Sequence, residues 1–202
     1  MELLIATSNP GKVHEYQILL GDLPVQLRSL NDVGLAGMDV EESGTTLEEN
    51  ATLKASAYSQ ASGLYALADD TGLFIDALNG EPGIYPARYG GPDLTMPERR
   101  AKVLAGLDGV PDAERTARFR CVIALGHPQD GTVQLVDGVV EGQISHIEDT
   151  ATGGFGYDPI FVPVGYTESF SALPIDEKNR ISHRGIATQR MVDILRGMIA
   201  AE

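Results

Sequence analysis

Apolar and polar positions near the N-terminus follow first a strand pattern and then a helix pattern. The run Glu2–Thr7 is mostly apolar and predicts a short strand. Ser8–Gly11 has the composition of a tight turn, and Lys12–Leu20 predicts a helix that ends at Gly21. The chain therefore opens with a strand, a loop and a helix.

A second helix is predicted by a capping box, in which Thr46 and Glu49 can each accept a hydrogen bond from a free backbone N–H group. Gly63 provides the expected end of this helix. The apolar run Leu64–Ala68 then predicts a buried strand, and Asp69–Gly72 predicts a turn at its end.

The second half of the chain begins with another capping box, formed by Thr95 and Glu98, for a helix that reaches about Leu104. Two or three strands are expected between residues 118 and 147, and a last helix over about 185–200. The apolar stripe of that helix consists of Ile186, Met191, Val192, Leu195, Met198 and Ile199. Helices and strands alternate early and strands cluster centrally, which predicts an α/β class with a mixed sheet in a single domain, residues 1–202.

Composition and charge exclude several classes of protein. Hydrophobic residues make up 43% of the chain and charged residues 22%, which is typical of a globular protein. The net charge of −14 disfavours a nucleic-acid partner. The longest stretch without charge, Ala55–Ala68, is shorter than the roughly 20 apolar residues of a membrane span, so no membrane association is expected. A single cysteine, Cys121, excludes an internal disulfide and favours a cytoplasmic location.

The first candidate site is the junction between the first strand and the first helix. Free N–H groups and the positive end of the helix dipole are expected there, which favours phosphate binding. Gly11 would allow a ligand to approach the backbone, and Lys12 would add a positive charge. The segment lacks the spacing of a P-loop, and a polar turn with a solvated lysine is the alternative.

The helix that begins after Thr46 carries a second candidate. Small and apolar residues share one arc of its surface, which Asn50 and Lys54 interrupt. Ser59 is assigned to the polar side. An inward-facing lysine must meet an anion or reach water, so Lys54 either points into a phosphate site or extends to solvent at the rim.

Asp69 and Asp70 form the third candidate, together with Glu41 and Glu42. Adjacent carboxylates after a buried strand can hold a hard cation, and water molecules can complete the coordination of that cation. A simple turn is the alternative. The Asp-Thr-Gly sequence at 70–72 also occurs in aspartic proteases, but a second such motif and a β fold would then be needed.

Two further segments complete the set. Gly153–Pro159 holds three glycines around two aromatic residues, which can give either a stacking platform for a planar ring or a core phenylalanine in a bulged strand. In Lys178–Gly185, cationic side chains gather just before the last helix. Because basic groups at a helix N-terminus oppose its dipole, their placement favours an anionic or acceptor-rich partner.

Taken together, these segments resemble the inosine triphosphate pyrophosphatase family, whose members hydrolyse non-standard purine nucleoside triphosphates such as ITP, dITP and XTP. The resemblance is carried by the segments 8–12 (SNPGK), 41–55 (EESGTT with ENATLKA), 69–73 (DDTGL), 80–89 (GEPGIYPARY), 153–161 (GGFGYDPIF) and 182–185 (SHRG). Each motif alone is weak, but their order and joint presence are specific.

The resemblance implies an elongated mixed β-sheet flanked by helices, two lobes with a central substrate cleft, a homodimer and dependence on Mg²⁺. It assigns Asp70 as the general base, Lys54 to catalysis, and Glu41 and Asp70 to the metal. It also implies substrate contacts at Thr7, Ser8, Asn9, Pro10, Gly11, Lys12, Thr71, Phe155, Gly156, Tyr157, Asp158, Lys178, His183 and Arg184.

The implied chemistry agrees with the residue types. A cation and lysines neutralise a triphosphate, and a carboxylate activates water for attack on the α-phosphorus. Two alternatives stay open: a related pyrophosphatase for other modified nucleotides, and a nucleotide sensor without turnover. The water-activating carboxylate argues against the sensor.

Overall fold

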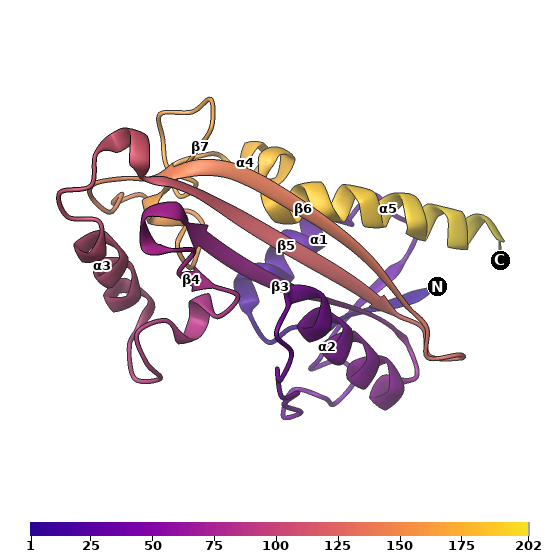
Figure 1. Ribbon diagram of the computed structural model, residues 1–202. Helices are drawn as coiled ribbons and strands as arrows, with labels where there is room; N and C mark the ends of the chain where they lie inside the picture. Colours follow the sequence, from indigo (N-terminus) through magenta and orange to yellow (C-terminus); the bar gives the residue numbers. More distant parts are fainter. Residues whose placement is uncertain (202) are drawn as a thin grey trace. The chain divides into compact units, whose positions relative to one another are not determined.

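The computed structural model describes residues 1–201 and has the predicted α/β class (Figure 1). The strands are β1 Glu2–Ile5, β2 Gln26–Ser29, β3 Tyr65–Ile75, β4 Pro82–Gly83, β5 Thr116–Gly126, β6 Val133–Ile144 and β7 Phe161–Pro163. The helices are α1 Pro10–Leu19, α2 Leu47–Ser62, α3 Met96–Gly106, α4 Ile175–Ile181 and α5 His183–Ala201.

The strands form one mixed sheet in the order β2-β1-β3-β5-β6-β7, with β4 on β3. β1 pairs in parallel with β2 and β3, whereas β3 pairs antiparallel with β4 and β6 with β7. The prediction of a mixed sheet is confirmed.

The chain divides into two compact units, each made of separate segments. Unit 1 comprises Met1–Asp70, Cys121–Gly138 and the chain from Arg184 onward, and unit 2 comprises Thr71–Arg120 and Val139–His183. The single domain predicted for residues 1–202 stays a prediction.

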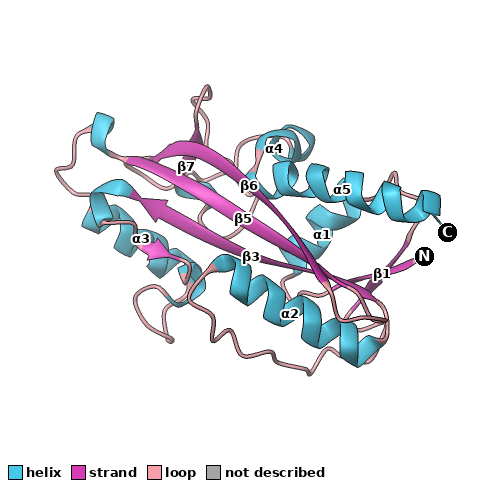
Figure 2. Ribbon diagram, turned by 45° about the vertical axis from the view of Figure 1, so that its right-hand side comes forward, coloured by secondary structure: helices cyan, strands magenta, loops and turns pink. Residues whose placement is uncertain are grey.

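In unit 1, helices lie on both sides of the strands. Apolar side chains of α1 and α5 pack on one side against β1, β3 and β5, in a cluster that includes Leu3, Tyr16, Leu67 and Met191. α2 lies on the opposite side (Figure 2). Gly126 permits this packing, because a Cβ atom there would lie 2.6 Å from the backbone oxygen of Ala55 in α2.

Unit 2 has its own core, in which β3 and β5 pack with α3 and the segment around β7. Its buried members include Leu73, Val103, Phe119, Phe161 and Phe170. The rings of Phe119 and Phe161 lie 4.7 Å apart between centroids. This core supports the glycine-rich segment and α4.

Most predicted helices are present with shifted ends. α1 begins at Pro10, because the side chain of Asn9 already caps it, so Ser8–Gly11 is not a separate turn. α2 is confirmed, with Thr46 as its N-cap and Gly63 in the left-handed conformation at its end. The assignment of Ser59 to the polar side was wrong, because its hydroxyl is buried and donates to the carbonyls of Leu64 and Gly126.

The turn predicted at Asp69–Gly72 was wrong. These residues lie inside β3, which continues to Ile75 and enters the core of unit 2. Carboxylates can occupy the interior of a buried strand here because each of them meets at least one cationic side chain. The two strands β5 and β6 confirm the prediction for residues 118–147.

Three short strands, β2, β4 and β7, and the helix α4 were missed. β2 follows α1 and pairs with β1, and α4 precedes α5. Lys178 and Arg180 therefore lie in the last turn of α4, where the helix dipole favours positive charge. The argument that these groups oppose a dipole was wrong for them. The last helix begins two residues earlier than predicted, at His183.

Candidate functional site

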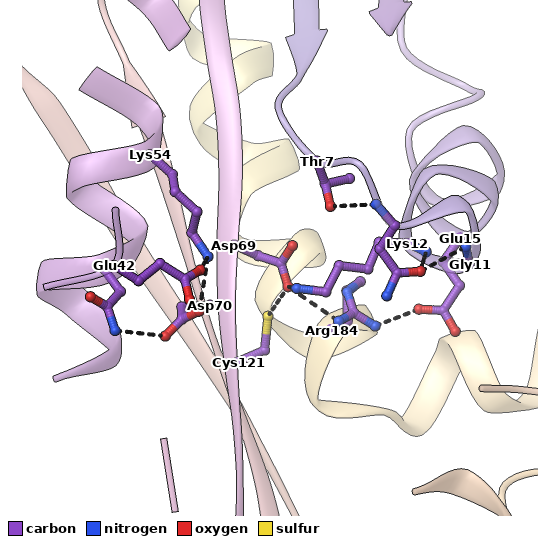
Figure 3. Close-up of polar contacts among 12 residues, drawn as sticks. Thr7, Gly11, Lys12, Glu15, Glu42, Lys54, Asp69, Asp70, Cys121 and Arg184 are labelled. Atoms are coloured by element: carbon purple, nitrogen blue, oxygen red, sulfur yellow. Dashed lines mark hydrogen bonds and ion pairs between the residues drawn. The ribbon is translucent and has the colours of Figure 1, made fainter. Parts of the chain in front are cut away.

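The central feature of unit 1 is a pair of adjacent carboxylates that point to opposite sides of β3 (Figure 3). Successive side chains of a strand alternate between its faces, so Asp70 turns toward α2 and Asp69 toward α1 and α5. Two separate charged clusters result.

The Asp70 cluster contains one ammonium group between two carboxylates. Lys54 Nζ lies 2.8 Å from Asp70 Oδ1 and 2.6 Å from Glu42 Oε1. The Lys54 side chain is 14% exposed, so the ammonium meets anions rather than extending alone into solvent. This pairing leaves an excess of one negative charge in the cluster.

Asn50 connects this cluster to the acidic loop that precedes α2. Its buried side chain donates from Nδ2 to Asp70 Oδ2 at 3.4 Å and accepts from the backbone N–H of Gly44 at 2.9 Å. Asn50 and Lys54 are one turn apart on α2, which explains why both interrupt its apolar face.

Burial changes the pKa values of the charged groups in this cluster. Desolvation raises the pKa of Asp70 above its usual range, although the ammonium of Lys54 acts in the opposite direction. Desolvation also opposes the charge of Lys54, but Asp70, Asp69 and Glu42 together raise the pKa of that ammonium. Asp70 is thus a more basic carboxylate than one exposed to water, which suits a proton acceptor.

The Asp69 cluster is enclosed and balanced in charge. Asp69 Oδ2 lies 2.8 Å from Lys12 Nζ and 3.1 Å from a guanidinium nitrogen of Arg184. Arg184 also binds Glu15 Oε2 at 2.6 Å, and the thiol of Cys121 lies 3.7 Å from Asp69. Two cations therefore meet two carboxylates in the interior of unit 1.

Asp69 responds to its surroundings in the direction opposite to Asp70. Its burial alone would raise its pKa, but Lys12, Arg184 and Lys54 outweigh burial and hold the pKa far below its usual range. Asp69 consequently stays ionised and links α1 to the start of α5.

The segment Thr7–Lys12 has fewer free donors than the sequence suggested. Asn9 Oδ1 accepts from the N–H groups of Gly11 and Lys12 at 2.9 and 3.4 Å, and Thr7 Oγ1 accepts from Asn9 N–H at 3.2 Å. The expectation of unpaired N–H groups was wrong for these positions. Ser8 and Pro10 are exposed beside them.

In unit 2, the glycine-rich segment forms a tight loop around Asp158. The Asp158 carboxylate accepts from the backbone N–H of Phe155 and from Lys178 Nζ, both at 2.7 Å. Lys178 Nζ also lies 4.9 Å from the centroid of the Phe155 ring. Gly154 is required here, because a Cβ atom would meet Asp158 Oδ2 at 2.5 Å.

The remaining predicted substrate residues lie around the unit 2 core or next to the points in the sequence where one unit ends and the other begins. Tyr157 is buried and donates from its hydroxyl to the carbonyl of Pro86 at 2.9 Å, and burial raises its pKa to about 12. His183 stacks on Phe119 with 4.6 Å between ring centroids. Thr71 is the half-buried residue after Asp70, and Gly156 is half-buried beside Phe155.

Sequence reasoning missed Glu15 and Arg100, and its assignment of Glu41 to the metal stays a prediction. Glu41 is exposed, whereas Glu42 contacts Lys54. Glu15 is a buried acid on α1, and Arg100 precedes Val103 by three positions on α3. Helical spacing to the apolar positions could have identified Arg100 as inward-facing.

Fold and site together define an α/β protein whose lysines and carboxylates suit a polyphosphate ligand. The sequence matches the Ham1 family over residues 3–194, and the chain belongs to that family. This confirms the resemblance drawn from the sequence motifs.

Similar proteins include the dITP/XTP pyrophosphatases of Desulforamulus reducens and Bacillus subtilis, which are 44% and 43% identical over 96% of each chain. A HAM1 protein from Coxiella burnetii has a solved structure with a TM-score of 0.85 and 40% identity, covering 98% of this chain and 99% of that one. Within residues 1–201, no helix has the length and apolar character needed to cross a bilayer.

Proposed function

We propose that this protein hydrolyses non-standard purine nucleoside triphosphates (ITP, dITP and XTP) to the monophosphate and pyrophosphate. The observation that carries the proposal is the environment of Asp70, a carboxylate of raised pKa held by Lys54 and Asn50. The names of the related pyrophosphatases support the same reaction.

In this mechanism, Asp70 is the general base. It accepts a proton from water as the water oxygen bonds to the α-phosphorus, and the bond from that phosphorus to the bridging oxygen breaks. Pyrophosphate leaves with the bonding electrons. Lys54 and Lys12 offset the phosphate charge, and residues 7–12 contribute donors when their internal hydrogen bonds exchange for phosphate oxygens.

The donor set around Asp70 fits Mg²⁺. Asp70 and Glu42 already share one cation, the Lys54 ammonium, and Glu41 is the exposed neighbour. Residues 1–201 contain no preassembled group of three or more metal-binding side chains. Mg²⁺ commonly binds one or two carboxylates together with water and substrate phosphates, so two carboxylates suffice. When bound, Mg²⁺ would supply neutralisation of phosphate charge.

We assign base recognition to Phe155, Gly156, Tyr157, Asp158, His183 and Arg184, and we assign contacts with the phosphates and the rest of the substrate to Thr71 and Lys178. A 6-keto purine offers an acceptor where adenine offers a donor, so a donor-lined site favours hypoxanthine and xanthine. In the structure Arg184 binds Glu15 and Asp69, so a base contact would have to coexist with those ion pairs or replace one.

The assembly and location of the protein stay predictions. We propose a homodimer in the cytoplasm that acts on a small-molecule nucleotide, without nucleic acid or membrane as a partner. The cleft between two lobes likewise rests on the family resemblance.

The decisive experiment is incubation with ITP and Mg²⁺, followed by identification of the products. IMP with pyrophosphate is expected, whereas IDP with phosphate would contradict the proposed attack at the α-phosphorus. Values of kcat/KM for ITP, dITP and XTP should greatly exceed that for ATP, with GTP also poor. Faster turnover of a modified pyrimidine nucleotide would favour the related pyrophosphatase, and tight ITP binding without turnover would favour a sensor.

A further inference from the structure

Two consecutive arginines on α3 are nearly buried in unit 2. Arg99 is 4% exposed and Arg100 is 8% exposed, and Val103 and Leu107 of the same region pack into the unit 2 core. A buried guanidinium is costly unless its donors find acceptors. The contacts of these two side chains therefore indicate what each one holds in place.

The two arginines hold different loops. Arg99 donates to the backbone carbonyls of Tyr89 and Gly91 at 2.7 and 2.8 Å. Arg100 donates to the carbonyl of Gly156 at 2.8 Å and to Glu148 Oε1 at 2.5 Å. Only the contact of Arg100 falls within the glycine-rich loop.

The Gly156 contact completes a set of restraints on that loop. Asp158 holds the Phe155 N–H group, and the Tyr157 hydroxyl holds the carbonyl of Pro86. Gly156 has no side chain and lies between these two anchors. Its carbonyl is the point at which Arg100 sets the orientation of the peptide group that joins Gly156 to Tyr157.

We propose that Arg100 is a positioning residue for base selectivity: through the Gly156 carbonyl it orients the loop that presents Phe155 to the purine ring. This inference rests on the proposed function, because it assumes that the loop receives the base. A charge-assisted hydrogen bond to a backbone carbonyl is strong enough to select one peptide orientation over its alternatives. Loss of Arg100 should therefore reduce selectivity for the base more than it affects the reaction at phosphorus.

The test compares Arg100→Met and Arg100→Lys with the wild-type enzyme on ITP and ATP. Arg100→Met should raise KM for ITP about tenfold, leave kcat within about threefold, and lower the ITP-to-ATP ratio of kcat/KM about tenfold. Arg100→Lys, which keeps a donor without the planar fork, should recover part of that ratio. Amide hydrogen exchange across residues 155–157 should be faster in Arg100→Met without substrate.

Two matched variants separate positioning from simple stabilisation. Arg115 is equally buried in unit 2 and donates to the carbonyls of Leu107, Ile144 and Ser145, outside the loop. Arg115→Met should lower the melting temperature without changing the selectivity ratio. Glu148→Gln removes a charge beside Arg100 but retains the Gly156 contact, so it should also leave the ratio unchanged.

Two results would count against the inference in different ways. Wild-type turnover of ITP with an unchanged ratio and unchanged KM in both Arg100 variants would overturn the positioning role and leave the proposed function intact. Absence of ITP hydrolysis by the wild-type protein would contradict the proposed function, and the inference with it.

Discussion

Asp69 and Asp70 lie on opposite sides of β3, and their environments shift their pKa values in opposite directions. Asp69 is enclosed by Lys12 and Arg184, and its pKa lies far below the usual range. Asp70 shares Lys54 with Glu42, and burial raises its pKa. Both carboxylates are buried, so burial alone does not separate them.

The difference lies in how many cations each carboxylate meets. Asp69 has two close cationic partners within a charge-balanced cluster, whereas Asp70 shares its single lysine with a competing acid. The first arrangement holds elements together and resists protonation. The second arrangement, around Asp70, leaves a basic carboxylate in a cluster with an excess of negative charge. Both properties suit a general base that lies next to a cation site. The following predictions test this division.

The largest effect is expected for Asp70→Asn. The amide preserves the shape of the side chain but cannot accept the proton, so turnover of ITP should fall by about 10² to 10⁴-fold. The melting temperature should be unchanged or slightly higher, because the substitution removes a carboxylate whose ionised form is disfavoured by burial. Steady-state kinetics and calorimetry measure both quantities, and wild-type rates in the purified variant would refute the assignment of the base.

Asp69→Asn should act mainly on stability. Removing this carboxylate leaves Lys12 and Arg184 without their shared partner, and breaking such a buried ion pair costs about 3–5 kcal/mol. Urea unfolding gives the free-energy difference. A variant as stable as wild type but as inactive as Asp70→Asn would show that both aspartates take part in the chemistry.

Lys54→Met tests the Asp70 cluster from the side of its cation. The substitution retains much of the side-chain volume but removes the charge that offsets phosphate, so kcat/KM for ITP should fall about 10²-fold. The melting temperature should fall less than in Asp69→Asn, because burial already favours the protonated form of Asp70 once its cation is removed. Unchanged kinetics with a clearly lower melting temperature would instead make Lys54 a structural residue.

Asn50→Ala is expected to have a smaller effect on the same cluster. Loss of one donor to Asp70 should lower kcat about tenfold. Ser59→Ala is the matched control, because Ser59 is equally buried on α2 but its hydroxyl donates to the backbone carbonyls of Leu64 and Gly126. The control should lose about 1 kcal/mol of stability and keep its kcat. Equal kinetic losses in both variants would argue against a specific contribution of Asn50.

The smallest effect concerns the pH dependence of stability. Because the folded-state pKa of Asp69 is depressed, its stabilising contribution is complete above the unfolded value of about 3.9 and is lost as pH falls through the lower folded value. The stability difference between wild type and Asp69→Asn should therefore be constant near neutrality and shrink below about pH 4. Asp70 has the opposite sign, since protonation of a group with raised folded pKa favours the folded state. Urea unfolding between pH 3 and 7 gives the free energy of unfolding of wild type, Asp69→Asn and Asp70→Asn. If the two aspartates did not differ in this way, the curves of this free energy against pH would be parallel for the two variants.

Local chemistry in the sequence determined four of the five helices, all except α4, and the identity of the charged residues. The capping residues Thr46 and Thr95 and the terminator Gly63 were sufficient to locate α2 and the start of α3, because capping depends on neighbours within one turn. The inward position of Lys54 and Asn50 also followed from helical spacing. The motifs identified the family.

Only the tertiary structure decided which partner each charged group has. The sequence favoured a turn at Asp69 and Asp70 because two acids in a buried strand are unfavourable without cationic partners. These partners, Lys12, Lys54 and Arg184, come from distant parts of the sequence. Glu42 rather than Glu41 meets Lys54, and Arg100 reaches Gly156 across more than fifty positions, for the same reason. Such pairings depend on long-range packing, whereas the pattern of neighbouring residues reports only what one helix turn or one strand can satisfy by itself.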